Sequence, residues 1–239
     1  MFLVNLSGER DVTHTLDLLS VAHGMTLGAT NLVHRVRVLF LMGPRALWQW
    51  QARSDITAEI EMQQPFIGLE RWNQTGLSNL LNRLELDNSP EAIDELSRYS
   101  HGWYFSLNIL AQKCLARRRD AARLSDLKSQ YTPIVESKPR ELQKFLVKTG
   151  LTVVAWGVPL ATELARLEKF DAEDLEVVLM DAQFEEMDID TRMAPATLRW
   201  LERLRVTDAH AGSGSGRTVY SITPSVAAAL RAVQAEAKS

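Results

Sequence analysis

Two short apolar runs near the start of the chain predict a pair of β-strands. The runs are FLVNL, from Phe2, and VRVLFLM, from Val36 to Met42, and apolar residues dominate both. A segment of helical periodicity, DVTHTLDLLSVAHGM, lies between them, so we expect parallel strands joined by a crossover helix, with Gly43 and Pro44 ending the second strand. Two strands leave edges and faces of a sheet uncovered. Residues 1–56 are therefore expected to form a partial α/β segment that takes further sheet from an upstream portion or from another molecule.

Residues 57–130 change to a helical pattern. In the first part of this segment, large apolar residues recur every three to five positions: Leu69, Trp72, Leu77, Leu80, Leu81 and Leu84. This spacing predicts an amphipathic helix, with Thr75 or Ser78 as candidate cap residues. Ser89 followed by Pro90 predicts the start of a second helix, because serine caps well and proline fits the first turn. We expect a small helical bundle over the segment.

The second of these helices should end within the stretch from Ser100 to Trp103. Glycine inside a helix costs about 1 kcal/mol relative to alanine, so Gly102 between two helical patterns predicts a turn. Trp103 is expected to start the next helix, which runs to Leu115, and to pack its large ring on the preceding helix.

Residues 131–239 predict successive short helices and then a sharper pattern. PATLRWLERLRV (Pro195 to Val206) predicts a helix, RTVYSIT (Arg217 to Thr223) a strand with two distinct faces, and PSVAAALRAVQAEA a final helix. The polar segment AGSGSGR supplies positive-φ freedom for a hairpin tip before the strand. Helix, strand, glycine-rich tip, strand and helix is the order of a winged helix. The fold class expected for the whole chain is mainly α with a small β component.

Composition limits the classes of protein and of site. The chain has 239 residues, 46% of them hydrophobic, so it can bury a sizeable core. No apolar stretch reaches the roughly 18 residues needed to cross a bilayer, and the start, MFLVNLSGERD, lacks the regions of a signal peptide. Cys114 is the single cysteine, which excludes an internal disulfide, and no Cys/His cluster has zinc spacing. We expect a soluble cytoplasmic protein with no membrane partner, metal or cofactor.

The helical segment carries three short motifs: W-x4-L-x2-L-L from Trp72, S-P-E-A-x3-L from Ser89, and the pair Gly102-Trp103. Together with the order of strand, helical bundle and winged helix, these motifs resemble the C-terminal half of P-loop ATPases of the STAND and AAA+ class. The resemblance implies that residues 36–42 are the sensor-bearing strand, that residues 72–115 are the helical lid with its turn at Gly102 and Trp103, and that a winged helix follows from about Lys138.

The chain departs from that class at the nucleotide site. Nowhere does it contain G-x4-G-K-[ST], so no loop of backbone N–H groups with a following lysine is present to cradle phosphates. Asn5 and Ser7 stand where such an ATPase would show acidic residues that hold Mg²⁺. We therefore expect no enzymatic activity from this chain and interpret it as the C-terminal portion of a larger or formerly larger ATPase.

Four arginines form the candidate contact site for DNA or for a protein partner: Arg199, Arg203, Arg205 and Arg217. Three lie on the helix from Pro195 and one follows the flexible tip, so they could meet phosphates while the helix and the wing approach a groove. Leucines and Trp200 dominate the same helix, however, which favours packing, and the net charge of −3 gives no global attraction to DNA.

Other residues have a structural interpretation beside a functional one. The run Arg117 to Arg119 could bind phosphate, but such runs more often are solvated helix ends. Arg45 could reach a nucleotide in a neighbouring subunit or lie on the surface after a turn. The acidic stretch Asp171 to Asp190 should face solvent or a basic partner. Trp48 and Trp50 are expected in the core, as most aromatic residues are.

Two functions of different class follow from these patterns. The first is a non-catalytic regulatory or interaction module, an ATPase-like C-terminal region that acts through protein–protein contacts or self-association, with a bacterial defence or signalling assembly as the setting that the resemblance implies. The alternative is a DNA-binding winged-helix protein with an N-terminal oligomerisation region.

Overall fold

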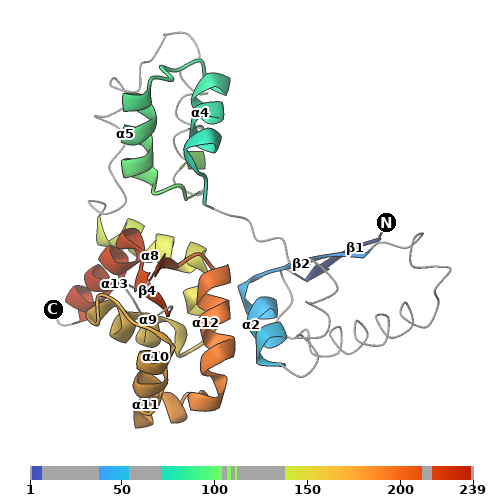
Figure 1. Ribbon diagram of the computed structural model, residues 1–239, viewed down its shortest axis with the longest axis vertical. Helices are drawn as coiled ribbons and strands as arrows, with labels where there is room; N and C mark the ends of the chain where they lie inside the picture. The colour runs from blue at the N-terminus through green and yellow to red at the C-terminus, as the bar shows by residue number, and fades with distance from the viewer. Residues whose placement is uncertain are drawn as a thin grey trace. The chain divides into compact units, whose positions relative to one another are not determined.

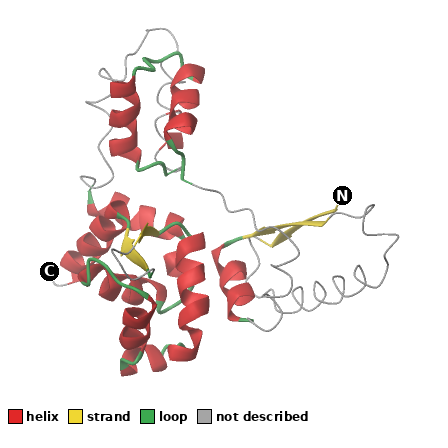
Figure 2. Ribbon diagram, in the orientation of Figure 1, coloured by secondary structure: helices red, strands yellow, loops and turns green. Residues whose placement is uncertain are grey.

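The structure is a computed structural model that describes residues 2–6, 38–53, 71–103, 107–108, 111, 138–211 and 217–237. Within these ranges the chain is mainly helical with two small two-stranded sheets, drawn in Figures 1 and 2, which confirms the expected fold class. It divides into two compact units. Unit 1 combines Met1–Gly68 with Thr149–Ile222, and unit 2 combines Leu69–Lys148 with Thr223–Ser239.

Several expectations fall outside the described residues. They are the crossover helix over residues 11–25, the glycine-rich tip at 212–216, the basic run at 117–119 and the expected domain boundaries near 56 and 130. These expectations stay predictions.

Unit 1 begins with the parallel strands that the apolar runs predict. β1 (Phe2–Leu6) pairs with β2 (Val38–Met42), so that Phe2 lies opposite Val38 and Leu6 opposite Met42. The described part of the second strand lies within the expected range of Val36 to Met42. Gly43 ends it and caps α2 (Pro44–Ala52), where Pro44 occupies the first turn and loses no hydrogen bond, because the first N–H groups of a helix have no partner within it.

The other described helices of unit 1 are short, as predicted: α9 (Gly157–Arg166), α10 (Ala172–Leu179), α11 (Ala182–Glu185) and α12 (Ala194–Arg203). Single 3-10 turns lie at Leu151–Val153 and Thr191–Met193. Three aspartates of the acidic stretch, Asp171, Asp181 and Asp190, accept backbone hydrogen bonds as N-caps. Part of that stretch therefore serves local structure.

A hairpin completes unit 1. β3 (Thr207–Ala211) and β4 (Thr218–Ile222) are antiparallel, and the burial of Tyr220 and Ile222 on one face of β4 confirms a strand with two distinct faces. Tyr220 also exchanges both backbone hydrogen bonds with Phe170, at 2.9 and 2.7 Å, and the two rings stack. The hairpin is followed in sequence by α13 (Pro224–Ala237), so the described elements keep the predicted order of helix, strand, strand and helix.

Unit 2 contains α4 (Gln74–Arg83) and α5 (Pro90–Ser100), which lie side by side in Figure 1, together with α8 (Pro139–Thr149) and α13. One apolar core joins α4, α5 and the segment after α5, and it consists of these side chains: Leu77, Leu81, Ala92, Leu96 and Leu107. Ser89 caps α5 by accepting from the Ala92 N–H, as predicted.

The cap of α4 corrects a prediction. Asn73, not Thr75 or Ser78, accepts a hydrogen bond from the Gly76 N–H, at 3.0 Å. Because the helix starts at Gln74, Thr75 and Ser78 lie inside it and cannot be its N-cap. Asparagine is as good a cap as serine.

Candidate functional site

The turn after α5 is built from two consecutive residues in the left-handed region. His101 has φ 47° and Gly102 has φ 72°, and the Gly102 N–H donates to the Ser100 hydroxyl at 3.1 Å. This confirms the turn that Gly102 predicts. The Leu107 N–H donates to the Trp103 carbonyl at 3.1 Å, which is the spacing of a helix that starts at Trp103. The Trp103 ring packs edge-to-face on Phe145 of α8, at 5.3 Å between centroids, a partner that the sequence does not indicate.

The same turn holds the chain just before α4. The Trp72 N–H donates to the Gly102 carbonyl at 2.8 Å. A Cβ on Gly102 would lie 2.4 Å from the Trp72 carbonyl oxygen, closer than any side chain can approach. Glycine is therefore required here both for its positive φ and for the close approach of two backbones.

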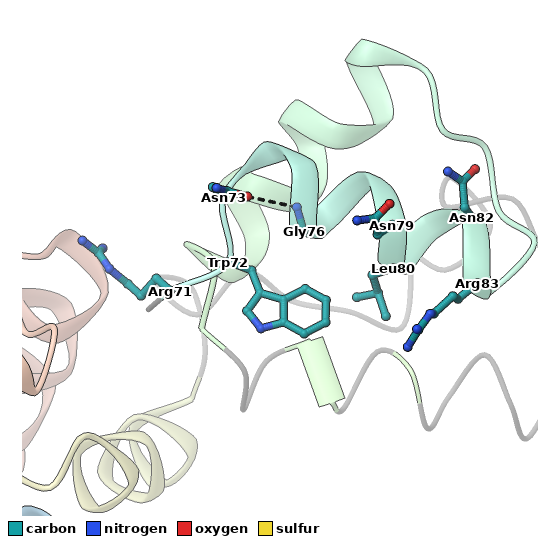
Figure 3. A pocket seen from close by; sticks show the side chains of 8 residues that line it. All are labelled: Arg71, Trp72, Asn73, Gly76, Asn79, Leu80, Asn82 and Arg83. Atoms are coloured by element: carbon teal, nitrogen blue, oxygen red, sulfur yellow. Dashed lines mark hydrogen bonds between the residues drawn. The ribbon is translucent and has the colours of Figure 1, made fainter. Parts of the chain in front are cut away.

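Trp72 in turn forms one end of an open groove along α4, shown in Figure 3. The groove has a volume of about 730 Å³, and Trp72, Gly76, Leu80 and Arg83 follow one another along it at helical spacing. The indole lies against Gly76, with its nearest atoms 3.4 Å from where a Cβ would be, and remains 36% exposed.

The lining of this groove is polar and cationic around its apolar floor. Among the residues that the structure describes, three asparagines and two arginines line it, and none of the lining residues is acidic. An indole can stack, amides can donate and accept, and a guanidinium can pair with an anion, but the eight described lining residues include no nucleophile or general base. The groove is suited to binding and not to catalysis. Sequence reasoning missed it as a site, although the exposed face of α4 could have been read from the spacing of Trp72, Gly76 and Leu80.

Of the four predicted contact arginines, Arg199 lies within unit 1 against α2. Its Nε donates to Oε1 of Gln51, at 2.9 Å, and Gln51 is fully buried. The neighbouring Trp200 is also fully buried, and its Nε1 donates to the Pro44 carbonyl at 2.9 Å. These two hydrogen bonds join α12 to α2.

An aromatic cluster reinforces the same contact. Trp48 of α2 lies 4.7 Å from Trp156 and 5.9 Å from Trp200 between ring centroids, and the last two lie 5.1 Å apart, all edge-to-face. Trp50 is buried, as predicted, whereas Trp48 is half-buried and contacts the core through this cluster.

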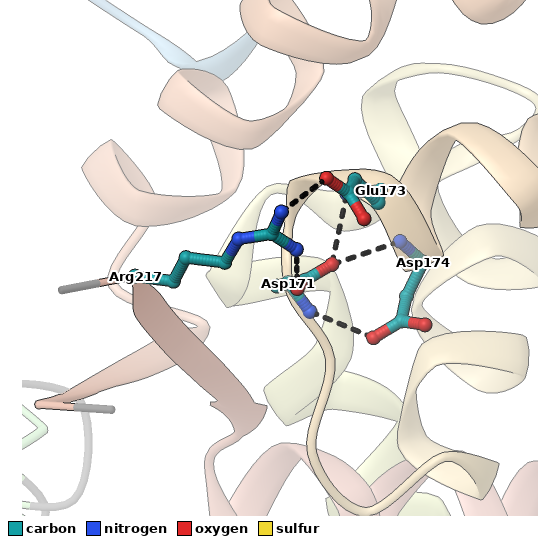
Figure 4. A network of polar contacts seen from close by, with 4 residues as sticks. All are labelled: Asp171, Glu173, Asp174 and Arg217. Carbon is teal, nitrogen blue, oxygen red and sulfur yellow. Dashed lines mark hydrogen bonds and ion pairs between the residues drawn. The ribbon is translucent and has the colours of Figure 1, made fainter. Parts of the chain in front are cut away.

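Arg217 pairs with carboxylates, as Figure 4 shows. Its Nη2 lies 2.9 Å from Glu173 Oε1 and its Nη1 3.7 Å from Asp171 Oδ2. The hydrogen bond with Glu173 raises the pKa of the Arg217 guanidinium above its usual value. Asp171 also forms a capping box with Asp174 at the start of α10. The acidic stretch thus supplies partners of the arginine that precedes β4.

The two other predicted arginines are half-buried. Arg203 lies in the last turn of α12, and Arg205 has φ 60°, at the point where the chain turns from α12 toward β3. Arg45, considered as a nucleotide contact, donates from Nη2 to the Val153 carbonyl at 2.6 Å.

Two further properties bear on ligands. In the described part of the chain, no group of three or more His, Cys, Asp or Glu side chains could hold a metal ion. Across the same ranges, no helix has both the length and the apolar character that a membrane span needs.

Comparison with known protein families, with curated proteins and with solved structures finds no match to this chain.

Proposed function

We propose that this chain is a non-catalytic regulatory or interaction module that acts through protein–protein contacts. The observation that carries the proposal is the covering of α12 by α2: this helix holds two of the four predicted contact arginines, and it uses Arg199 and Trp200 to contact α2. A recognition helix must present its polar face to the major groove of DNA. A helix engaged in this way is better suited to internal packing.

The STAND and AAA+ resemblance agrees with this proposal, because winged helices in that class often serve as packing modules. The single cysteine agrees with a reducing cytoplasm as the compartment. The acidic partners of Arg217 argue against the DNA-binding alternative, since phosphate contact would require this side chain to leave two carboxylates.

Fluorescence anisotropy of a labelled DNA duplex, at roughly 50 and 200 mM salt, tests the proposal, because binding through phosphates weakens steeply over this range. We expect no salt-sensitive binding by the wild type. The triple variant Arg199→Ala/Arg203→Ala/Arg217→Ala should then give the same anisotropy as the wild type, because there is no DNA binding for it to weaken. Salt-sensitive binding that the triple variant loses about equally for different duplex sequences would favour the DNA-binding alternative instead.

A further inference from the structure

The α4 groove combines an immobilised aromatic side chain with an uncompensated positive charge. Trp72 is fixed at its backbone by the hydrogen bond to the Gly102 carbonyl, and its ring lies on the flat surface that Gly76 leaves on α4. An exposed indole held in this manner loses little conformational entropy when a ligand covers it, which is the property of a good contact residue.

The charge of the groove is positive in a chain whose net charge is −3. α4 contains no acidic residue, whereas α5 beside it carries Glu91, Asp94 and Glu95. Arg83 ends α4, and in the ranges that the structure describes no carboxylate forms an ion pair with it. Figure 3 shows its side chain beside Leu80, on the same face of the helix as the indole.

We propose that the α4 groove docks an acidic peptide segment of a partner protein, with an apolar side chain of that segment on Trp72 and Leu80 and a carboxylate on Arg83. The amides of Asn79 and Asn82 supply hydrogen bonds to its backbone. The choice of occupant rests on charge complementarity: the described lining of the groove has two arginines, three amides and no carboxylate. A volume of about 730 Å³ accommodates a short peptide segment.

This inference rests on the proposed function and names the chemistry of its partner. The test uses the full chain and fluorescein-labelled octapeptides in an anisotropy titration. The probe is DEDFLEDE, and the comparison peptides are DEDGGEDE, which lacks the apolar pair, and KKKFLKKK, which reverses the charge. We expect saturable binding of the first peptide alone.

Two variants and a matched control locate the binding. Arg83→Glu and Trp72→Ala should each weaken the affinity for DEDFLEDE by about tenfold or more, because like-charge repulsion and loss of a central aromatic contact both carry costs of this order. Arg140→Glu, which makes the same change at an exposed arginine of α8 in unit 2, should alter it by less than about threefold. Circular dichroism and a urea midpoint establish that each variant is folded.

Each other outcome overturns the inference. Equal binding of DEDGGEDE shows attraction of any polyanion, and equal losses in Arg83→Glu and Arg140→Glu show a general charge effect. If DEDFLEDE does not bind even at millimolar concentration, the α4 groove is not a docking site for an acidic peptide. Tighter binding of a single-stranded oligonucleotide that Trp72→Ala abolishes would assign the groove to base stacking. None of these results decides the proposed function, which fails only if the duplex experiment shows salt-sensitive DNA binding.

Discussion

Gly76 and Gly102 both border Trp72, and their surroundings differ in a way that a single added methyl group can measure. At Gly76, a Cβ would meet the indole at 3.4 Å, an ordinary contact distance. At Gly102, it would meet the Trp72 carbonyl oxygen at 2.4 Å in a residue with φ 72°. The first glycine is an open helical position, and the second is required by the turn.

Alanine at these two positions should therefore change stability in opposite directions. Gly102→Ala should lower the free energy of unfolding by about 2 kcal/mol or more, because an L-residue in the left-handed region costs 1–2 kcal/mol and the backbones must also separate. Gly76→Ala should raise it by up to about 1 kcal/mol, as expected for alanine in a helix. Urea unfolding measures both. A Gly102→Ala variant as stable as the wild type would show that the turn tolerates a side chain.

Tyr220 gives a prediction for alkaline pH. Burial, with a smaller contribution from the Glu202 carboxylate, raises the pKa of its hydroxyl above the usual value. A group whose pKa is higher in the folded state contributes stability that is present below its unfolded pKa and is lost as pH rises through its folded pKa. The wild type should lose stability more steeply than Tyr220→Phe above about pH 10, the usual tyrosine value. The urea midpoints of the two proteins are measured from about pH 8 to about pH 11, roughly the range in which tyrosine titrates. Midpoints that fall equally with pH in both proteins would contradict the prediction.

At the scale of the element, local signals are predicted well from the sequence and distant partners are not. Ser89 and Gly102 act on residues within one helical turn, so their roles as cap and turn are visible in the sequence. Arg199 and Gln51 are 148 positions apart, and no periodicity connects them. The sequence therefore indicates an apolar α12 but not that α2 covers it. The α4 groove is intermediate, since its residues follow helical spacing while the exposure of Trp72 depends on the Gly102 turn.

The packing of α12 on α2 predicts which substitution in α12 is costly. Trp200→Ala should lower the free energy of unfolding by about 3–5 kcal/mol, because it leaves a cavity among Trp48 and Trp156 and removes the hydrogen bond to the Pro44 carbonyl. Val177→Ala on α10 is the control: this side chain is 65% exposed and should change stability by less than about 0.5 kcal/mol. Similar midpoints for both variants in thermal unfolding would show that the tryptophan cluster does not hold unit 1 together.

At the scale of the whole molecule, each unit draws on segments that lie far apart in the sequence. Changes of hydrophobic pattern reveal where one kind of element gives way to another, but they carry no information on which distant segments meet. In unit 1 the contact of α2 with Trp156 and α12 depends on the shape of the tryptophan rings and on single hydrogen bonds. Neither feature produces a periodic pattern in the sequence. Sequence reasoning therefore reaches the fold class, the order of elements and local caps and turns, but not the contacts between distant segments.

The chain as a whole should not bind ATP with useful affinity. The sequence contains no G-x4-G-K-[ST] loop, so the ring of backbone N–H groups that holds the β- and γ-phosphates is missing. Calorimetric titration of the full chain with Mg-ATP should show no binding heat at micromolar concentrations. A micromolar dissociation constant would contradict the interpretation of the chain as non-catalytic and would require a phosphate site of another type.

Self-association is the last property expected at this scale, and it follows from the β1–β2 pair. Parallel strands occur in sheets with both faces covered, yet in the described ranges no third strand pairs with either one, and Leu41 is 45% exposed. Light scattering should therefore give a mass above the 26.9 kDa of one chain, approaching a dimer as concentration rises. Leu41→Lys should shift the mass toward the monomer, because a charge on an apolar contact disfavours association. Val147→Lys changes an equally apolar position that is 59% exposed on α8 and should leave the mass unchanged. A wild type that stays monomeric at high concentration, with amides protected from exchange in both strands, would show that the strand pair is stable without a second copy. An equal shift of the mass in both lysine variants would show that the contact between copies lies elsewhere.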